Sequence, residues 1–185
     1  MVDFADPMAG VTILPSDPWP RSNVTEEVLR ELVGDGLLRP VTNLERPEWI
    51  VPAYDEEEPR PWEGYVVSFV VFHQRGFGML VSRFMRALLR NYEVELHNFT
   101  PNSIAQAAIF VAVYEGYMGI APHWDLWLHL FRAETSFQSS GEKGVKKAVR
   151  AGGCTLQLRQ EHSHLYIPAK LSKSNKGWQE WWFYL

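Results

Sequence analysis

The sequence predicts an α+β fold that is mostly α, with a compact helical core, a C-terminal β-hairpin and a short strand ahead of the helices. Apolar residues recur at helical spacing in consecutive segments between residues 82 and 131. From Cys154 onward they alternate instead with polar residues at period two. The composition, 46% hydrophobic and 22% charged over 185 residues, is typical of a chain that folds around one core.

The chain is expected to divide into three regions, of which the first two precede the core. Residues 1–22 are rich in Pro and Asp without periodicity, which indicates a disordered leader. Residues 23–63 begin with a short amphipathic helix, for which Thr25 is the expected N-cap. Five prolines and an acidic run at residues 55–58 then predict an extended connector.

The third region, residues 64–185, should hold the core. Residues 65–72 are dense in Val and aromatic side chains, so we expect a strand, with a short helix as the alternative. Helices should follow over residues 82–92, 100–118 and 122–131. Thr100 and Pro101 supply an N-cap and a first-turn proline to the middle helix, which is apolar nearly all round and should therefore be central.

The C-terminal part of this region is expected to be β-structure. After a soluble Ser/Gly/Lys stretch at residues 135–147, alternation predicts a hairpin of residues 154–158 and 165–171. The chain ends on an aromatic run, which as a strand over residues 177–185 would pack one face on the hairpin. Its other face would be exposed, as expected of a surface for a protein partner or for self-association.

Charge is distributed unevenly along the chain, whose net charge is −4. Residues 1–64 carry 5 Lys/Arg against 14 Asp/Glu, whereas residues after 139 carry 8 against 3. The acidic head and the basic tail could attract each other, or the tail could bind nucleic acid. We favour the first alternative, because the basic residues of the tail are scattered and the pI is only about 5.9.

The sequence offers no recognisable catalytic, metal or cofactor site. The single cysteine, Cys154, excludes an intrachain disulfide and points to the nucleus or the cytoplasm. No secretory signal is found, and the most apolar stretch is shorter than the roughly 20 residues that a membrane span needs. Glu115 is unusual as a carboxylate in an apolar helix, and we expect it to join Arg75, Gly76 and His123 in one structural network.

Four blocks of the sequence occur in a characteristic order: residues 64–69 (GYVVSF), 73–78 (HQRGFG), 100–104 (TPNSI) and 119–123 (GIAPH). With these blocks the chain resembles the gypsy-type transposon domain of plant retroelements, a family of uncharacterised molecular function sometimes labelled transposase. The resemblance spans roughly residues 24–185. The chain differs from the family at Met79-Leu80, where a Pro is expected, and at Tyr114, where a Cys usually precedes the Glu.

This resemblance implies an origin in a retroelement and no established catalytic residue. The sequence also lacks the protease, reverse-transcriptase and zinc-knuckle motifs of such elements. We therefore expect a non-enzymatic, structural or gag-like interaction domain without cofactors, with nucleic-acid binding through the basic C-terminal third as the alternative. The residues that carry the resemblance, interpreted as structural, are Arg75, Gly76, Phe77, Gly78, His97, Pro101, Asn102, Glu115, Gly119, Pro122, His123 and Trp182.

Overall fold

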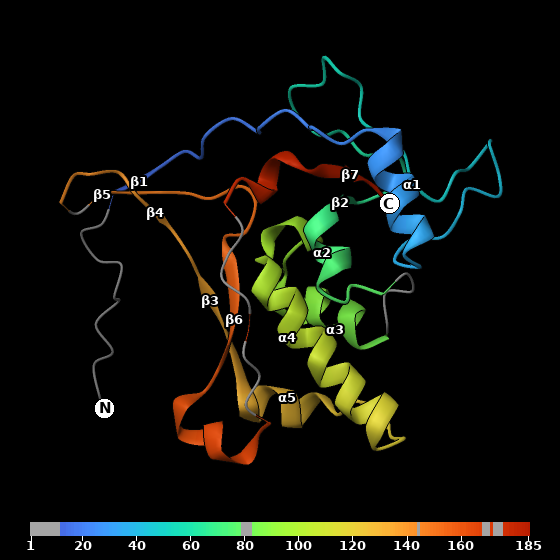
Figure 1. Cartoon of the computed structure of the whole chain (residues 1–185). Helices are drawn as coiled ribbons and strands as arrows, with labels where there is room; N and C mark the ends of the chain where they lie inside the picture. The colour runs from blue at the N-terminus through green and yellow to red at the C-terminus, as the bar shows by residue number, and fades with distance from the viewer. Residues whose placement is uncertain (1–11, 79–82, 144, 168–170, 172–175) are drawn as a thin grey trace.

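The computed structural model of the chain describes residues 12–78, 83–143, 145–167, 171 and 176–185, and it has the expected mixture of helices and short strands (Figure 1). Among the described residues, no helix is long and apolar enough to cross a membrane. The helices are α1 (Glu26–Gly34), α2 (Val70–Gln74), α3 (Arg83–Tyr92), α4 (Pro101–Val111) and α5 (Trp124–Leu130). The strands are β1 (Thr12–Leu14), β2 (Val67–Phe69), β3 (Phe131–Thr135), β4 (Gln138–Ser139), β5 (Val145–Lys147), β6 (Cys154–Leu158) and β7 (Trp182–Tyr184). Short 3₁₀ turns lie at Leu96–Asn98, Gln160–Leu165 and Trp178–Glu180.

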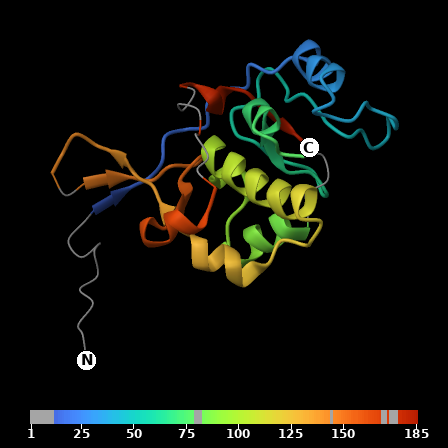
Figure 2. The ribbon, with the colours of Figure 1, turned by 60° about the horizontal axis from the view of Figure 1, so that its bottom comes forward.

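The central helix is α4, as its apolar sequence predicts. Thr100 is its N-cap and accepts a hydrogen bond from the backbone N–H of Ser103, while Pro101 occupies the first turn. Phe110 packs edge-to-face against Trp127 of α5, with ring centroids 5.1 Å apart. α3 and α5 lie together beneath α4 in Figure 2, and Phe84 joins the same aromatic cluster.

The second half of the long helix differs from the expectation. After Val111 the chain continues as a π-helical segment, Ala112–Tyr117, in which none of the side chains is buried. The expectation of a central, buried helix therefore holds for Pro101–Phe110, most of whose side chains are buried, and is wrong beyond Val111. Ile109 is only partly buried, whereas Ile104 is completely buried. Ser82, the residue at which the helix over residues 82–92 is expected to begin, lies outside the described residues.

Both alternatives for residues 65–72 are present, one after the other. Val67–Phe69 forms β2, and the chain then turns directly into the short helix α2. β2 pairs antiparallel with the C-terminal strand β7, with Ser68 opposite Phe183.

The C-terminal strand β7 lies in the interior. Besides β2 on one side, it has Ile50 of the connector on the other, through two backbone hydrogen bonds between Ile50 and Tyr184. Trp182, Phe183 and Tyr184 are all fully buried. The prediction of one exposed face is therefore wrong, because Trp182 and Tyr184 pack into the main core on one face and Phe183 packs into the cluster around α1 on the other. Of the aromatic side chains at residues 178–184, only Trp181 is exposed.

The strand predicted at residues 154–158 is present as β6, but its partner is different. β6 pairs antiparallel with β3, from Phe131 opposite Leu158 to Thr135 opposite Cys154. The predicted turn and the start of the second strand form instead the 3₁₀ turn Gln160–Leu165, and residues 168–170 lie outside the described residues. Residues 135–147, expected to be a soluble Ser/Gly/Lys stretch, contribute β4 and β5 to a small sheet that projects from the rest in Figure 2.

The leader expected to be disordered is ordered from residue 12 onward; residues 1–11 lie outside the described residues. β1 adds to β5 in parallel, and Trp19 packs on the core against Phe69 and Trp182. The Pro-rich composition predicts disorder, but the contacts of the large Trp19 ring with the core stabilise this segment. The predicted head helix is confirmed as α1, which buries Leu29 and Leu32 in a cluster that includes Phe183.

Candidate functional site

Most residues that carry the family resemblance serve the fold. Arg75 ends α2, and Gly76 follows with φ of +86°, a conformation that favours glycine. A Cβ at Gly76 would also lie 3.1 Å from the Cβ of Ala108, so the turn packs closely on α4. Phe77 is buried against the ring of His73, whereas Gly78 lies at the exposed end of the turn.

Four other resemblance residues lie at the starts of elements or in the core. The ring of His97 contacts Trp19 edge-on, and its backbone carbonyl accepts a hydrogen bond from Gly152. Burial lowers the pKa of His97, opposed by the carboxylate of Glu95 at 3.2 Å. Pro101 and Asn102 open α4, and the buried Oδ1 of Asn102 has no hydrogen-bond partner among the described residues. Trp182 is a core residue whose indole N–H donates to the carbonyl of Pro20.

The remaining resemblance residues, Glu115, Gly119, Pro122 and His123, lie on one exposed turn. The network expected around Glu115 is wrong, because this carboxylate is exposed on the π-helical segment, where water solvates it. His123 is also exposed and lies 3.9 Å from Asp125 of α5. We call residues 115–123 the docking turn.

The docking turn exposes large apolar side chains. Tyr117 is 89% exposed, Met118 52% and Ile120 50%. Gly119 reverses the chain between them with φ of +67°. Apolar side chains grouped in this way on a protein surface are typical of protein–protein contact sites.

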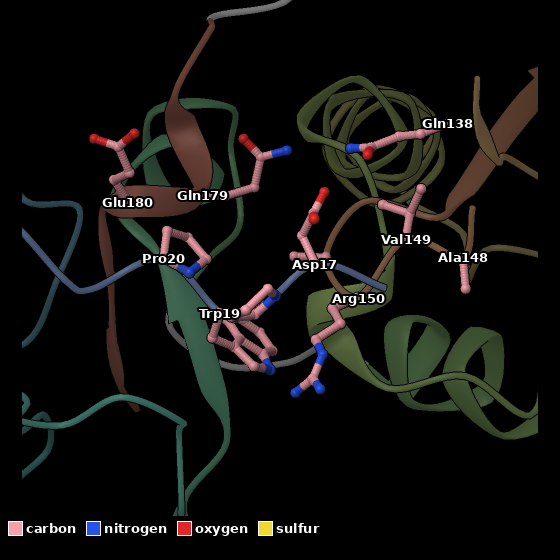
Figure 3. A pocket seen from close by; sticks show the side chains of 11 residues that line it. Asp17, Trp19, Pro20, Gln138, Ala148, Val149, Arg150, Gln179 and Glu180 are labelled. Carbon is pink, nitrogen blue, oxygen red and sulfur yellow. The ribbon is translucent and has the colours of Figure 1, made fainter. Parts of the chain in front are cut away.

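A second surface feature is a cleft of about 280 Å³ where the head meets the tail (Figure 3). Its walls come from the segment around Trp19, from β4, from the turn after β5 and from the 3₁₀ turn at residues 178–180. Beside the cleft, Arg150 pairs with Glu58 and donates to Ser16 Oγ at 2.7 Å, while Lys147 pairs with Asp17. The expected attraction between acidic head and basic tail is thus present in the structure.

A serine and a histidine lie within hydrogen-bond distance, but in the interior. Ser68 Oγ is 3.0 Å from His73 Nε2, and the carbonyl of Leu37 is 3.3 Å from Nδ1. Both side chains are fully buried, and burial lowers the pKa of His73 to about 4. The pair links β2 to α2, and the contact with Leu37 links α2 to the segment after α1. Because both side chains are buried, a substrate could not reach them.

Other chemistry-bearing side chains are similarly placed. The thiol of Cys154 is buried, which raises its pKa. The ring of His162 lies against that of His129, with centroids 3.9 Å apart and the planes tilted by 41°. Within the described part of the chain, no three His, Cys, Asp or Glu side chains are grouped so that they could hold a metal ion.

A positively charged surface lies on α3, which the charge balance of long segments of the sequence does not indicate. Arg83, Arg86 and Arg90 are all exposed, on the side opposite the buried Phe84 and Leu88. Residues 65–139 hold equal numbers of acidic and basic residues, which hides the fact that residues 64–92 contain no Asp or Glu at all. The charge balance of residues 64–92 taken alone does indicate this positively charged surface.

Comparison with known proteins confirms the family resemblance for the central part of the chain. Residues 66–135, from β2 to β3, match the family described as "Putative gypsy type transposon". No curated protein and no solved structure matches the chain. The docking turn and α3 both lie within the matched residues, whereas Trp182 and the head lie outside them.

Proposed function

Starting from the family match of residues 66–135, we propose that the chain is a non-catalytic, structural domain of a gypsy-type retroelement that associates with further copies of itself in a gag-like manner. The observation that carries this proposal is the docking turn. Four of the residues that carry the family resemblance, Glu115, Gly119, Pro122 and His123, meet at this exposed turn. Between them lie Tyr117, Met118 and Ile120, whose large side chains are exposed to water.

A second copy of the chain is the occupant that we propose for this surface. The turn has an acidic residue, Glu115, at one end and His123 at the other, with the apolar side chains between them. Two copies related by a twofold axis would bury the apolar centre and place opposite ends beside each other. The aromatic C-terminus, which the sequence first indicated for this role, supports self-association less well, because its side chains are buried.

Sedimentation velocity of the full chain over a range of concentrations tests the proposal. The wild type should form dimers or larger species, and the double variant Tyr117→Ser, Met118→Ser should stay monomeric at the same concentrations. A matched control is Tyr54→Ser with Leu44→Ser, since these side chains are 90% and 92% exposed but lie in the connector. A monomeric wild type, or a turn variant that associates as the wild type does, would contradict the proposal.

The alternative function, nucleic-acid binding through the basic C-terminal third, has less support from the structure. Lys147 and Arg150 pair with acidic residues of the head, and Arg159 lies 4.0 Å from Glu161. Charges that are already paired release fewer counterions when they meet a phosphate backbone, so they contribute less to binding.

A further inference from the structure

We infer that the exposed face of α3 is a binding site for the phosphodiester backbone of nucleic acid. The site consists of Arg83, Arg86 and Arg90, which we call the arginine face. This inference goes beyond the proposed function and does not depend on self-association, because the docking turn is a separate surface.

The first argument is the geometry of the helix. Residues three and four apart lie on one side of an α-helix, so the three arginines fall within about 60° of one another around the axis and extend over about 10 Å along it. Phe84 and Leu88 hold the opposite side of α3 in the core, where Phe84 packs against Phe110 and Trp127. The helix therefore presents the guanidinium groups outward from a fixed support.

The second argument is that, in the part of the chain that the structure describes, no carboxylate is paired with these arginines. Among the described residues, no ion pair or hydrogen bond involves the side chains of these arginines, whereas Arg132, Arg150 and Arg159 each lie beside an acidic side chain. Residues 64–92 contain no Asp or Glu, so α3 carries no negative charge of its own. The chain as a whole has a net charge of −4, so its long-range attraction to a polyanion is weak. The positive charge of α3 would therefore act on a phosphate backbone only at close range.

The third argument concerns the chemistry of arginine. Its planar fork donates paired hydrogen bonds to phosphate oxygens and loses little hydration energy on binding. Three such groups in a row match a repeating phosphate backbone and offer no pattern that reads bases. The arginine face should thus bind without sequence preference, and the backbone of either RNA or DNA could supply the phosphates.

Fluorescence anisotropy with the full chain tests this inference. The probes are a labelled 20-nucleotide single-stranded RNA and a 20-base-pair DNA duplex, each titrated at several salt concentrations. Neutralising three phosphates predicts a slope of log K against log salt of about −2 for the single strand and about −3 for the duplex. Comparison of the two probes at equal salt shows which nucleic acid is preferred.

Two triple variants with the same change in charge separate the arginine face from the tail. Arg83→Gln, Arg86→Gln, Arg90→Gln should weaken binding about tenfold or more at low salt, with the salt slope lost. Lys143→Gln, Lys146→Gln, Lys176→Gln in the tail should change it less than threefold. Replacing the three arginines by Lys keeps the charge and should retain most of the affinity. Circular dichroism of each variant checks that it is folded.

Other results would overturn the inference. It fails if the wild type binds neither probe at low salt, or if the tail variant loses binding while the arginine-face variant keeps it. It also fails if poly-glutamate of equal charge competes as well as the RNA does, since the face would then bind acidic protein segments in preference to a phosphate backbone.

Discussion

At the scale of single residues, His73 links three parts of the chain through one imidazole ring. Its nitrogens face Ser68 of β2 and the carbonyl of Leu37 in the head, while its ring contacts Phe183 of β7. Because the ring is fully buried, the neutral form is favoured and its pKa is lowered to about 4. The unfolded chain, by contrast, binds a proton near the ordinary pKa of about 6.5.

This difference predicts a pH dependence of stability. Below pH 6.5 the unfolded state takes up a proton that the native state does not, so stability is present above that pH and is lost as pH falls towards about 4. His73 alone should lower the free energy of unfolding by about 2 kcal/mol between pH 7.5 and pH 5. Urea unfolding of the wild type and of His73→Gln at a series of pH values measures this contribution as the difference between their pH slopes.

The exposed His123 provides the control for this measurement. His123→Gln makes the same substitution at an exposed side chain, so it controls for the loss of an imidazole without the loss of a buried contact. His97, whose pKa burial also lowers, should keep a remaining slope of the same sign in the His73 variant. Equal slopes in the wild type and His73→Gln would show that His73 is protonated in the native state.

At the scale of secondary structure, local signals predict an element and long-range contacts decide its partner. Thr100 and Pro101 mark the start of α4 correctly, because capping depends on neighbours within one turn. Alternation likewise identifies β6. The partner of β6 is β3, however, because Ser103 of α4 hydrogen-bonds to Cys154 and Leu156 and holds β6 beside the helical core. The sequence pattern of residues 154–171 does not indicate this contact with Ser103.

The same limit explains the exposed second half of the long helix. An apolar run of sequence does not indicate how far along a helix other elements of the fold pack against it. Residues 112–120 extend past the elements that cover Pro101–Phe110. The sequence could therefore predict the helix and the residues of the docking turn, but it could not predict that the turn faces water. The arginine face could be predicted from the sequence, because both the helix and the lack of acidic residues can be recognised from residues 64–92 alone.

Replacing two isoleucines of α4 by alanine tests how its burial is distributed. Ile104→Ala should cost about 2 to 5 kcal/mol of unfolding free energy, because the side chain is fully buried and the change leaves a cavity. Ile109→Ala should cost about 1 kcal/mol, since Ile109 is partly exposed. Both variants make the same change in the same helix, so helix propensity cancels when their urea unfolding curves are compared. Similar losses would show that the two faces of α4 are equally buried.

At the scale of the whole molecule, β7 joins the head to the core. Trp182 and Tyr184 belong to the core cluster, whereas Phe183 between them belongs to the cluster that contains α1. The hydroxyl of Tyr184 also donates to Glu56 and accepts from the backbone N–H of Arg60, which ties the connector to the same strand. Burial and the carboxylate of Glu56 raise the pKa of Tyr184 well above its ordinary value, although the hydrogen bond from the N–H of Arg60 acts in the opposite direction.

These shared contacts predict that head and core unfold together, although the sequence suggested separate regions at residues 23–63 and 64–185. Leu29→Ala removes a fully buried side chain that lies only in the head cluster and should cost about 2 to 5 kcal/mol. If β7 makes the molecule one cooperative unit, the slowest-exchanging amides of α1 and of α4 should lose protection by the same factor. Hydrogen exchange followed by mass spectrometry measures both helices in one experiment. Ile104→Ala, a change confined to the core cluster, should give the same pattern, whereas faster exchange in α1 alone after Leu29→Ala would mean that the head opens without the core.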